Sequence, residues 1–124
     1  MSYNRELALD ILLQINNAIL TIQQRTGMIR SADDFLESPY GMEKLDATCM
    51  QFIAIGESLK ELDKITNKEL LVSHPEIPWK RIKGLRDIIA HHYFDIDAEE
   101  IWWILQHELC PLQDAISSMI ADLS

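Results

Sequence analysis

The stretch NRELALDILLQINNAILTIQQRT, residues 4–26, decides the fold class, because its apolar side chains recur at steps of three and four residues. These positions are Leu7, Ile11, Ile15, Ala18, Ile19 and Ile22. Such spacing places them on one face of a helix with about 3.6 residues per turn. The stretch therefore predicts a long amphipathic helix, which Gly27 is placed to close.

A second helix of similar length is predicted after a short connecting segment. Ser38 followed by Pro39 is a typical cap and first turn, and a second apolar stripe then runs to about Lys64. Gly56, within this stripe, would let a neighbouring helix approach closely, at a cost of about 1 kcal/mol relative to alanine. Two long amphipathic helices in succession predict an antiparallel pair.

The rest of the chain predicts three further helices, at about residues 79–92, 98–109 and 111–123. Asp97 and Glu100 form a capping box for the middle one. The sequence contains no alternating strand pattern, internal repeat or low-complexity segment. We therefore predict an all-α antiparallel bundle of four to five main helices, in a single domain of residues 1–124.

Charge and composition narrow the function. The formal net charge of −9 argues against charge-driven binding to DNA or to anionic membranes, because such binding depends on many lysine and arginine contacts with phosphates. No stretch approaches the ~18 apolar residues of a membrane span, and the start of the chain lacks a signal-peptide pattern. We expect a cytoplasmic protein.

Neither the cysteines nor the histidines suggest a metal. Cys49 and Cys110 lie within apolar helical patterns, which favours buried free thiols in a reducing compartment. Adjacent side chains such as His91 and His92 diverge on a helix, and the histidines have no recognised metal-ligand spacing. We expect no metal site and no cofactor.

The best candidates for chemistry lie in WKRIKGLRDIIAHHY, residues 79–93. Four of the eleven basic residues fall within seven positions of it: Lys80, Arg81, Lys83 and Arg86. At about 100° per residue, one side of the helix gathers the apolar side chains Ile82, Leu85, Ile88 and Ile89. His92 falls on this buried side. Asp87 and His91 fall on the opposite side, and Arg86 lies at the border.

The polar side carries groups that suit phosphate chemistry. Asp87 and His91 are four residues apart, so the carboxylate can fix the imidazole tautomer and raise its pKa. Arg86 offers planar donors to a phosphate whose charge grows in a transition state. This set suits a ribonuclease in which the 2′-hydroxyl of the RNA is the nucleophile. Because Arg86 and His91 are about 140° apart on an ideal helix, they converge only if the helix loosens after Ala90 or if a second copy supplies one of them.

Plainer interpretations stay open. A surface pattern such as Arg86, Asp87 and His91 can be ordinary helix decoration, and the basic run can be a solvated face or a docking surface for an acidic partner. Tyr93, at a helix end, is in isolation most often a half-buried packing residue with a satisfied hydroxyl.

The spacing of Arg86, His91 and Tyr93, Arg-x4-His-x-Tyr within GLRDIIAHHYFDID, resembles the signature of HEPN-domain proteins, and is most similar to the HepT toxin branch. A helix with paired tryptophans, Trp102 and Trp103, follows the signature. The similarity extends over essentially the whole chain and includes the FLESP, AIGESLKEL and IPW segments.

The resemblance implies an all-α bundle that forms a homodimer, with two motifs at a shared cleft and metal-independent endoribonuclease activity. It implies that Arg86 and His91 are the catalytic pair. It further implies that Tyr93 is the hydroxyl that a minimal nucleotidyltransferase antitoxin modifies with AMP to silence the toxin. Asp87 departs from the more usual asparagine, and its charge would weaken RNA binding unless it orients His91. His92 has no assigned role.

Three functional hypotheses follow. The first is a ribonuclease toxin of a toxin–antitoxin pair, with RNA bound along Lys80, Arg81 and Lys83. The second is a non-catalytic nucleotide-binding or adaptor module that partners a nucleotidyltransferase. A plain helical dimerisation protein is the third and simplest possibility.

Overall fold

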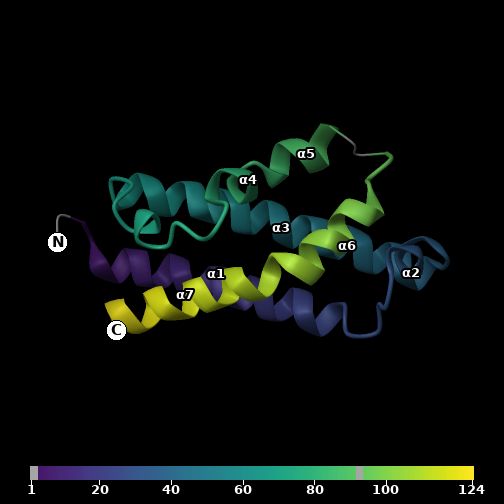
Figure 1. The fold of residues 1–124 in the computed structure, drawn as a ribbon, viewed down its shortest axis with the longest axis horizontal. Helices are drawn as coiled ribbons and strands as arrows, with labels where there is room; N and C mark the ends of the chain where they lie inside the picture. Colours follow the sequence, from purple (N-terminus) through teal and green to yellow (C-terminus); the bar gives the residue numbers. More distant parts are fainter. Residues whose placement is uncertain (1–2, 92–93) are drawn as a thin grey trace.

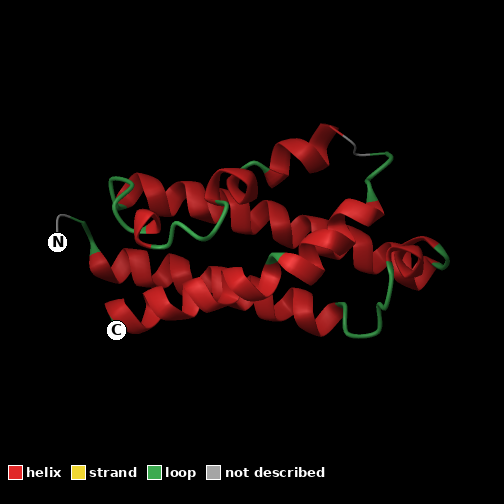
Figure 2. Cartoon of the chain, in the orientation of Figure 1, coloured by secondary structure: helices red, strands yellow, loops and turns green. Residues whose placement is uncertain are grey.

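The computed structural model describes residues 3–91 and 94–124, and within these ranges the chain forms helices and no strand (Figure 2). The elements in chain order are α1 (Arg5–Arg25), α2 (Ala32–Leu36), α3 (Pro39–Ile65), the 3₁₀ turn η1 (Leu71–Ser73), α4 (Trp79–Lys83), α5 (Leu85–His91), α6 (Ala98–His107) and α7 (Leu109–Leu123). The prediction of an all-α bundle is confirmed. None of these helices is long and apolar enough to cross a bilayer.

Side-chain caps fix where the main helices begin. At the start of α1, the side-chain oxygen of Asn4 accepts a hydrogen bond of 3.0 Å from the backbone amide of Leu7. Ser38 accepts the amide of Gly41 at 3.0 Å at the start of α3. The predicted cap of α6 is also confirmed, with the carboxylate of Asp97 accepting an amide of the first turn at 3.2 Å. Each of these bonds satisfies an amide that has no partner within its helix.

The three longest helices, α1, α3 and α7, lie roughly along one direction (Figure 1). α1 packs against both α3 and α7, and α3 and α7 each run antiparallel to α1. At the ends of α1 and α7, the Nε of Arg5 donates to the carbonyl of Leu123 at 2.7 Å. α4 and α5 lie along α3, and α2 packs against α3 and α6.

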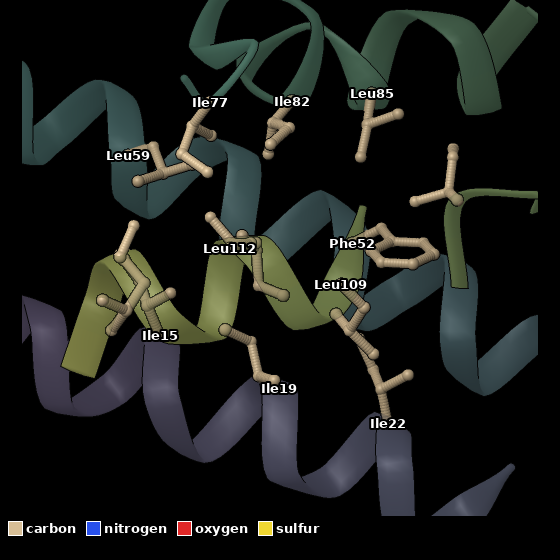
Figure 3. Packing of buried hydrophobic residues seen from close by; sticks show 14 of the residues in the cluster. Ile15, Ile19, Ile22, Phe52, Leu59, Ile77, Ile82, Leu85, Leu109 and Leu112 are labelled. Carbon is tan, nitrogen blue, oxygen red and sulfur yellow. The ribbon is translucent and has the colours of Figure 1, made fainter. Parts of the chain in front are cut away.

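One hydrophobic cluster joins these helices. In Figure 3, α7 lies between α1 and the α4–α5 segment, and presents Leu112 and Leu109 to the side chains around it. Ile19 of α1, Phe52 of α3 and Leu85 of α5 reach the same cluster and are almost fully buried. Burial of each such side chain contributes about 1.5–3 kcal/mol.

The predicted single helix over residues 79–92 is wrong, because Gly84 divides its described part into α4 and α5. The amide of Gly84 bonds the carbonyls of both Lys80 and Arg81, and the amide of Asp87 bonds the carbonyl of Gly84 itself at 3.1 Å. The bonds from Gly84 to Arg81 and from Asp87 to Gly84 span three residues, so tighter three-residue bonds occur beside the regular four-residue bonds at this junction.

A tertiary contact accompanies this break. A Cβ built on Gly56 of α3 would lie 3.0 Å from the carbonyl oxygen of Ile82 and 3.3 Å from that of Lys83. The end of α4 therefore packs directly against the backbone of α3. This agrees with the prediction that Gly56 lets a neighbouring helix approach closely. At these distances any larger side chain would force the neighbouring backbone to shift by a few tenths of an ångström, whereas glycine allows the close approach without a shift.

A few side chains depart from their expected burial. Cys49 is buried as predicted, but Cys110 is exposed, because it faces away from the stripe of α7 that meets the core. Leu7, which the sequence places in the apolar stripe of α1, is 42% exposed, and Leu36 and Met42 are 54% and 53% exposed.

Candidate active site

α5 presents the candidate catalytic side chains to solvent. Its core side is anchored by Leu85 and Ile89, both buried, while Arg86, Asp87 and His91 are exposed. The helix phase predicted for these residues is confirmed, with Ile88 half-buried at the margin. The expectations for His92 and Tyr93 lie outside the described residues.

Arg86 is held by a carboxylate of the neighbouring long helix. Its Nη1 lies 3.2 Å from Oε1 of Glu57 on α3, and 58% of the arginine side chain is exposed. The other oxygen of Glu57, Oε2, lies 3.5 Å from Nζ of Lys60 on the same helix. Glu57 thus connects the catalytic candidate to α3, a role that the sequence patterns did not reveal.

An open groove of about 480 Å³ lies beside Arg86, between α3, α5 and Ile96, which lies just before α6. Its lining is mostly apolar and comprises Asp46, Cys49, Met50, Ile53, Arg86, Ile89, Ala90 and Ile96. Met50 is 63% exposed at this groove. Burial, with a smaller contribution from Asp46, raises the pKa of the Cys49 thiol to about 12, so this thiol is not a ready nucleophile.

Asp87 and His91 share the exposed side of α5, but the structure does not bring them together: within the described residues no ion pair or hydrogen bond joins them. α5 remains helical through His91. Arg86 and His91 are therefore separated by about 7.5 Å along the axis and by about 140° around it. A single copy of α5 does not direct both side chains at one phosphate.

The basic run of α4 is largely neutralised by carboxylates of the same chain. Nζ of Lys83 forms an ion pair with Asp63 of α3. Nε of Arg81 lies 2.9 Å from Oε1 of Glu108, at the junction of α6 and α7. Lys80 is exposed. The predicted RNA-binding trio is therefore one exposed lysine and two side chains that already pair within the chain.

Arg81 stands at the centre of a further polar cluster. A second carboxylate, Glu100, lies 3.6 Å from it, and its guanidinium is 5.3 Å from the ring centroid of Trp103. Trp103 in turn stacks on His107 with centroids 4.7 Å apart. Oε2 of Glu108 is buried without a hydrogen-bond partner among the described residues, and burial, more than its neighbours, raises the pKa of this carboxyl.

No group of three His, Cys, Asp or Glu side chains suited to a metal ion occurs within residues 3–91 and 94–124. The absence of a metal requirement stays a prediction.

The model of the family described as "Ribonuclease HepT-like" matches residues 15–119. The chain belongs to the HepT-like ribonuclease family. The match spans α5 and every residue that lines the groove beside Arg86. No solved structure matches the chain.

Relatives of this HepT-like chain carry ribonuclease names. "Putative RNase TTE0752" of Caldanaerobacter subterraneus subsp. tengcongensis is 30% identical over 90 residues, which is 73% of this chain and 74% of the relative. "Putative RNase MJ0127" of Methanocaldococcus jannaschii is 35% identical over 69 residues, 56% of this chain and 54% of the relative. "Probable ribonuclease HepT" of Thermococcus cleftensis is 30% identical over 59 residues, 48% of this chain and 50% of the relative.

Proposed function

We propose that this HepT-like protein is a metal-independent endoribonuclease and the toxin of a toxin–antitoxin pair. The observation that carries the proposal is the exposure of Arg86 and His91 on one short helix beside an open groove, in a chain of a ribonuclease family. The imidazole of a histidine can accept and donate a proton, and the guanidinium of an arginine offers several donors to a phosphate, so the pair supplies proton transfer and charge stabilisation.

In the proposed reaction, His91 takes the proton from a 2′-hydroxyl, whose oxygen attacks the adjacent phosphorus. The bond from phosphorus to the 5′-oxygen of the next nucleotide breaks, and a protonated His91 returns a proton to that oxygen. The products are a 2′,3′-cyclic phosphate and a 5′-hydroxyl. Arg86 binds the phosphate oxygens as their negative charge increases. Asp87 would orient His91 once the substrate has changed the position of the imidazole.

The active unit in this proposal is a homodimer. Since α5 stays helical through His91, the separation of Arg86 and His91 is best overcome by a second copy that supplies the opposite member. The exposed Met50 and the half-buried Ile53, both at the groove beside Arg86, give that copy an apolar surface to cover. Two motifs would then share one cleft.

We propose Lys80 as the principal contact of the basic run with the RNA backbone, because it is exposed. Arg81 and Lys83 would contribute less, since part of their charge is offset by Glu108 and Asp63. The acidic remainder of the protein would keep RNA away from its other surfaces.

We further propose that a minimal nucleotidyltransferase is the antitoxin and transfers AMP to Tyr93. The family resemblance of the spacing from Arg86 through His91 to Tyr93 supports this acceptor, and the position of Tyr93 itself lies outside the described residues. A bulky anion at Tyr93, two residues from His91, would repel an RNA phosphate.

The test is expression of the protein alone, with growth and RNA integrity compared among wild type, Arg86→Ala, His91→Ala and the control Arg25→Ala. Arg25 is an exposed arginine at the end of α1, remote in sequence from α5. We expect wild type and Arg25→Ala to stop growth and cut RNA, and the two α5 variants to do neither. If the wild type leaves growth and RNA intact, the toxin proposal is refuted and the adaptor hypothesis takes its place.

The modification is tested by co-expression with a nucleotidyltransferase partner and mass spectrometry. We expect AMP additions that disappear in Tyr93→Phe and persist in Tyr40→Phe, a control at a tyrosine that is 49% exposed on α3. Additions that persist in Tyr93→Phe would refute the proposed acceptor.

A further inference from the structure

We propose that Glu57 is a positioning residue for Arg86, which holds the guanidinium in the orientation that phosphate stabilisation requires. The inference rests on the proposed ribonuclease function. It assigns to α3 a part in the reaction that the motif on α5 does not contain.

The need for such a residue follows from the place of Arg86. Its side chain is 58% exposed and starts at the border of α5, so packing alone leaves several rotamers open. The contact between Nη1 and Oε1 of Glu57, 3.2 Å, selects the rotamers that point along α3. A guanidinium has five N–H donors, so this contact leaves others for a phosphate.

Glu57 is itself held in place. Its Oε1 meets Arg86, while its Oε2 meets Nζ of Lys60 at 3.5 Å, so the carboxylate lies between two cations. Lys60 also offsets the negative charge that Glu57 would otherwise add next to a phosphate site. The trio Arg86, Glu57 and Lys60 has a net charge of +1, whereas an isolated pair of Arg86 and Glu57 would be neutral.

The same part of α3 also fixes the backbone that carries Arg86. Gly56, the residue before Glu57, receives the carbonyls at the end of α4, and Asp63, about two turns further, pairs with Lys83. Side chain and backbone of the Arg86 segment are thus both placed from α3. The contact of Glu57 with Arg86 therefore lies beside the place where the end of α4 packs against Gly56, which favours a structural purpose over a chance surface contact.

The opposite role would be competition, in which Glu57 occupies Arg86 and RNA must displace it. The two roles differ in sign: loss of a positioning contact lowers kcat, whereas loss of a competing contact lowers KM and raises cleavage. The carboxamide of glutamine separates them further, because its oxygen still accepts from the guanidinium without carrying charge.

The experiment measures kcat and KM of RNA cleavage for wild type, Glu57→Ala, Glu57→Gln and Glu61→Ala, the last an exposed glutamate one turn further along α3. For Glu57→Ala we expect kcat to fall about tenfold with KM within about twofold, since misplacement of a catalytic group acts mainly on the chemical step. Glu57→Gln should stay within about threefold of wild type, and Glu61→Ala should match it. Unchanged or faster cleavage by Glu57→Ala, or equal damage by Glu57→Gln, overturns the inference.

A second readout does not depend on cleavage. In protein labelled with ¹⁵N-arginine, the side-chain Nε–H signal of Arg86, assigned from its loss in Arg86→Lys, should show lower order in Glu57→Ala than in wild type. Identical signals would overturn the positioning contact even if cleavage fell. A wild type that cuts no RNA would instead refute the proposed function, and with it the catalytic part of this inference, whatever the arginine signal shows.

Discussion

Replacement of Gly56 by alanine tests whether the seat of α4 on α3 is as tight as the structure indicates. Two effects oppose each other. Alanine in place of glycine within a helix stabilises it by about 1 kcal/mol. The new Cβ, however, would lie 3.0 Å from the carbonyl oxygen of Ile82 and 3.3 Å from that of Lys83, and both atoms belong to the backbone. The end of α4 would have to move by a few tenths of an ångström.

Such overpacking costs about 1–3 kcal/mol, so we expect Gly56→Ala to lose about 1 kcal/mol of unfolding free energy overall. For a chain of this length, that loss lowers Tm by roughly 3–6 °C. Urea and thermal unfolding followed by circular dichroism measure both. Because Arg86 follows the displaced segment, RNA cleavage should fall by more than the loss of stability explains.

Gly27→Ala is the matched control, because its Cβ would meet only Gln24 O at 3.5 Å and Gln23 O at 3.9 Å, which are ordinary contacts. This variant should be unchanged or more stable by up to about 1 kcal/mol. If Gly56→Ala gains stability as Gly27→Ala does, α4 does not approach α3 as closely as described, and the division of the helix at Gly84 has another cause.

Three further outcomes are expected. At pH 8 a disulfide reagent should label Cys110 rapidly and Cys49 only after unfolding, because Cys49 is buried and its pKa is raised to about 12; equal rates for the two thiols would contradict the structure. Burial raises the pKa of Glu108, so the folded state holds the carboxyl proton more tightly than the unfolded state, whose pKa is about 4.3. The free energy of unfolding should therefore fall as the pH rises from about 4.3 through the raised folded pKa. Urea unfolding between pH 4 and 7 should show a weaker fall in Glu108→Gln, and the same pH dependence in the variant and the wild type would contradict this prediction. Arg81→Ala should lower the free energy of unfolding by about 1–2 kcal/mol, because it leaves the Glu108 carboxylate without its partner. The 39% exposure of Arg81 keeps this loss below that of a fully buried ion pair. Lys80→Ala should change the free energy of unfolding by less than about 0.5 kcal/mol in the same urea titration.

The features that the sequence predicted well are those set within one helix. The features concerned are the stripe of α1 apart from the exposed Leu7, the caps at Ser38 and Asp97, the border position of Arg86 and the outward position of His91. Each depends on residues within a few positions of one another. Local spacing is sufficient information for them.

The features that it missed depend on pairs far apart in the chain. Arg81 is 27 residues from Glu108 and Lys83 is 20 from Asp63, so a basic run that looks free in sequence is paired in the fold. The division of the helix at Gly84 accompanies the contact of Gly56 with Ile82 and Lys83, which lie 26 and 27 residues further along the chain. Glu57 lies in the AIGESLKEL segment that contributes to the family resemblance, but nothing in its own helix indicates that Arg86 will lie opposite.

The division of the helix at Gly84 makes the position of His91 sensitive to small rotations of α5. His91 lies seven residues beyond Gly84, a distance of about 10 Å along the helix axis. A rotation of only about 10° at Gly84 would therefore carry the backbone of His91 through nearly 2 Å, which is more than half the length of a hydrogen bond. A small change of backbone torsion at Gly84 is therefore enough to move the exposed end of α5 relative to α3.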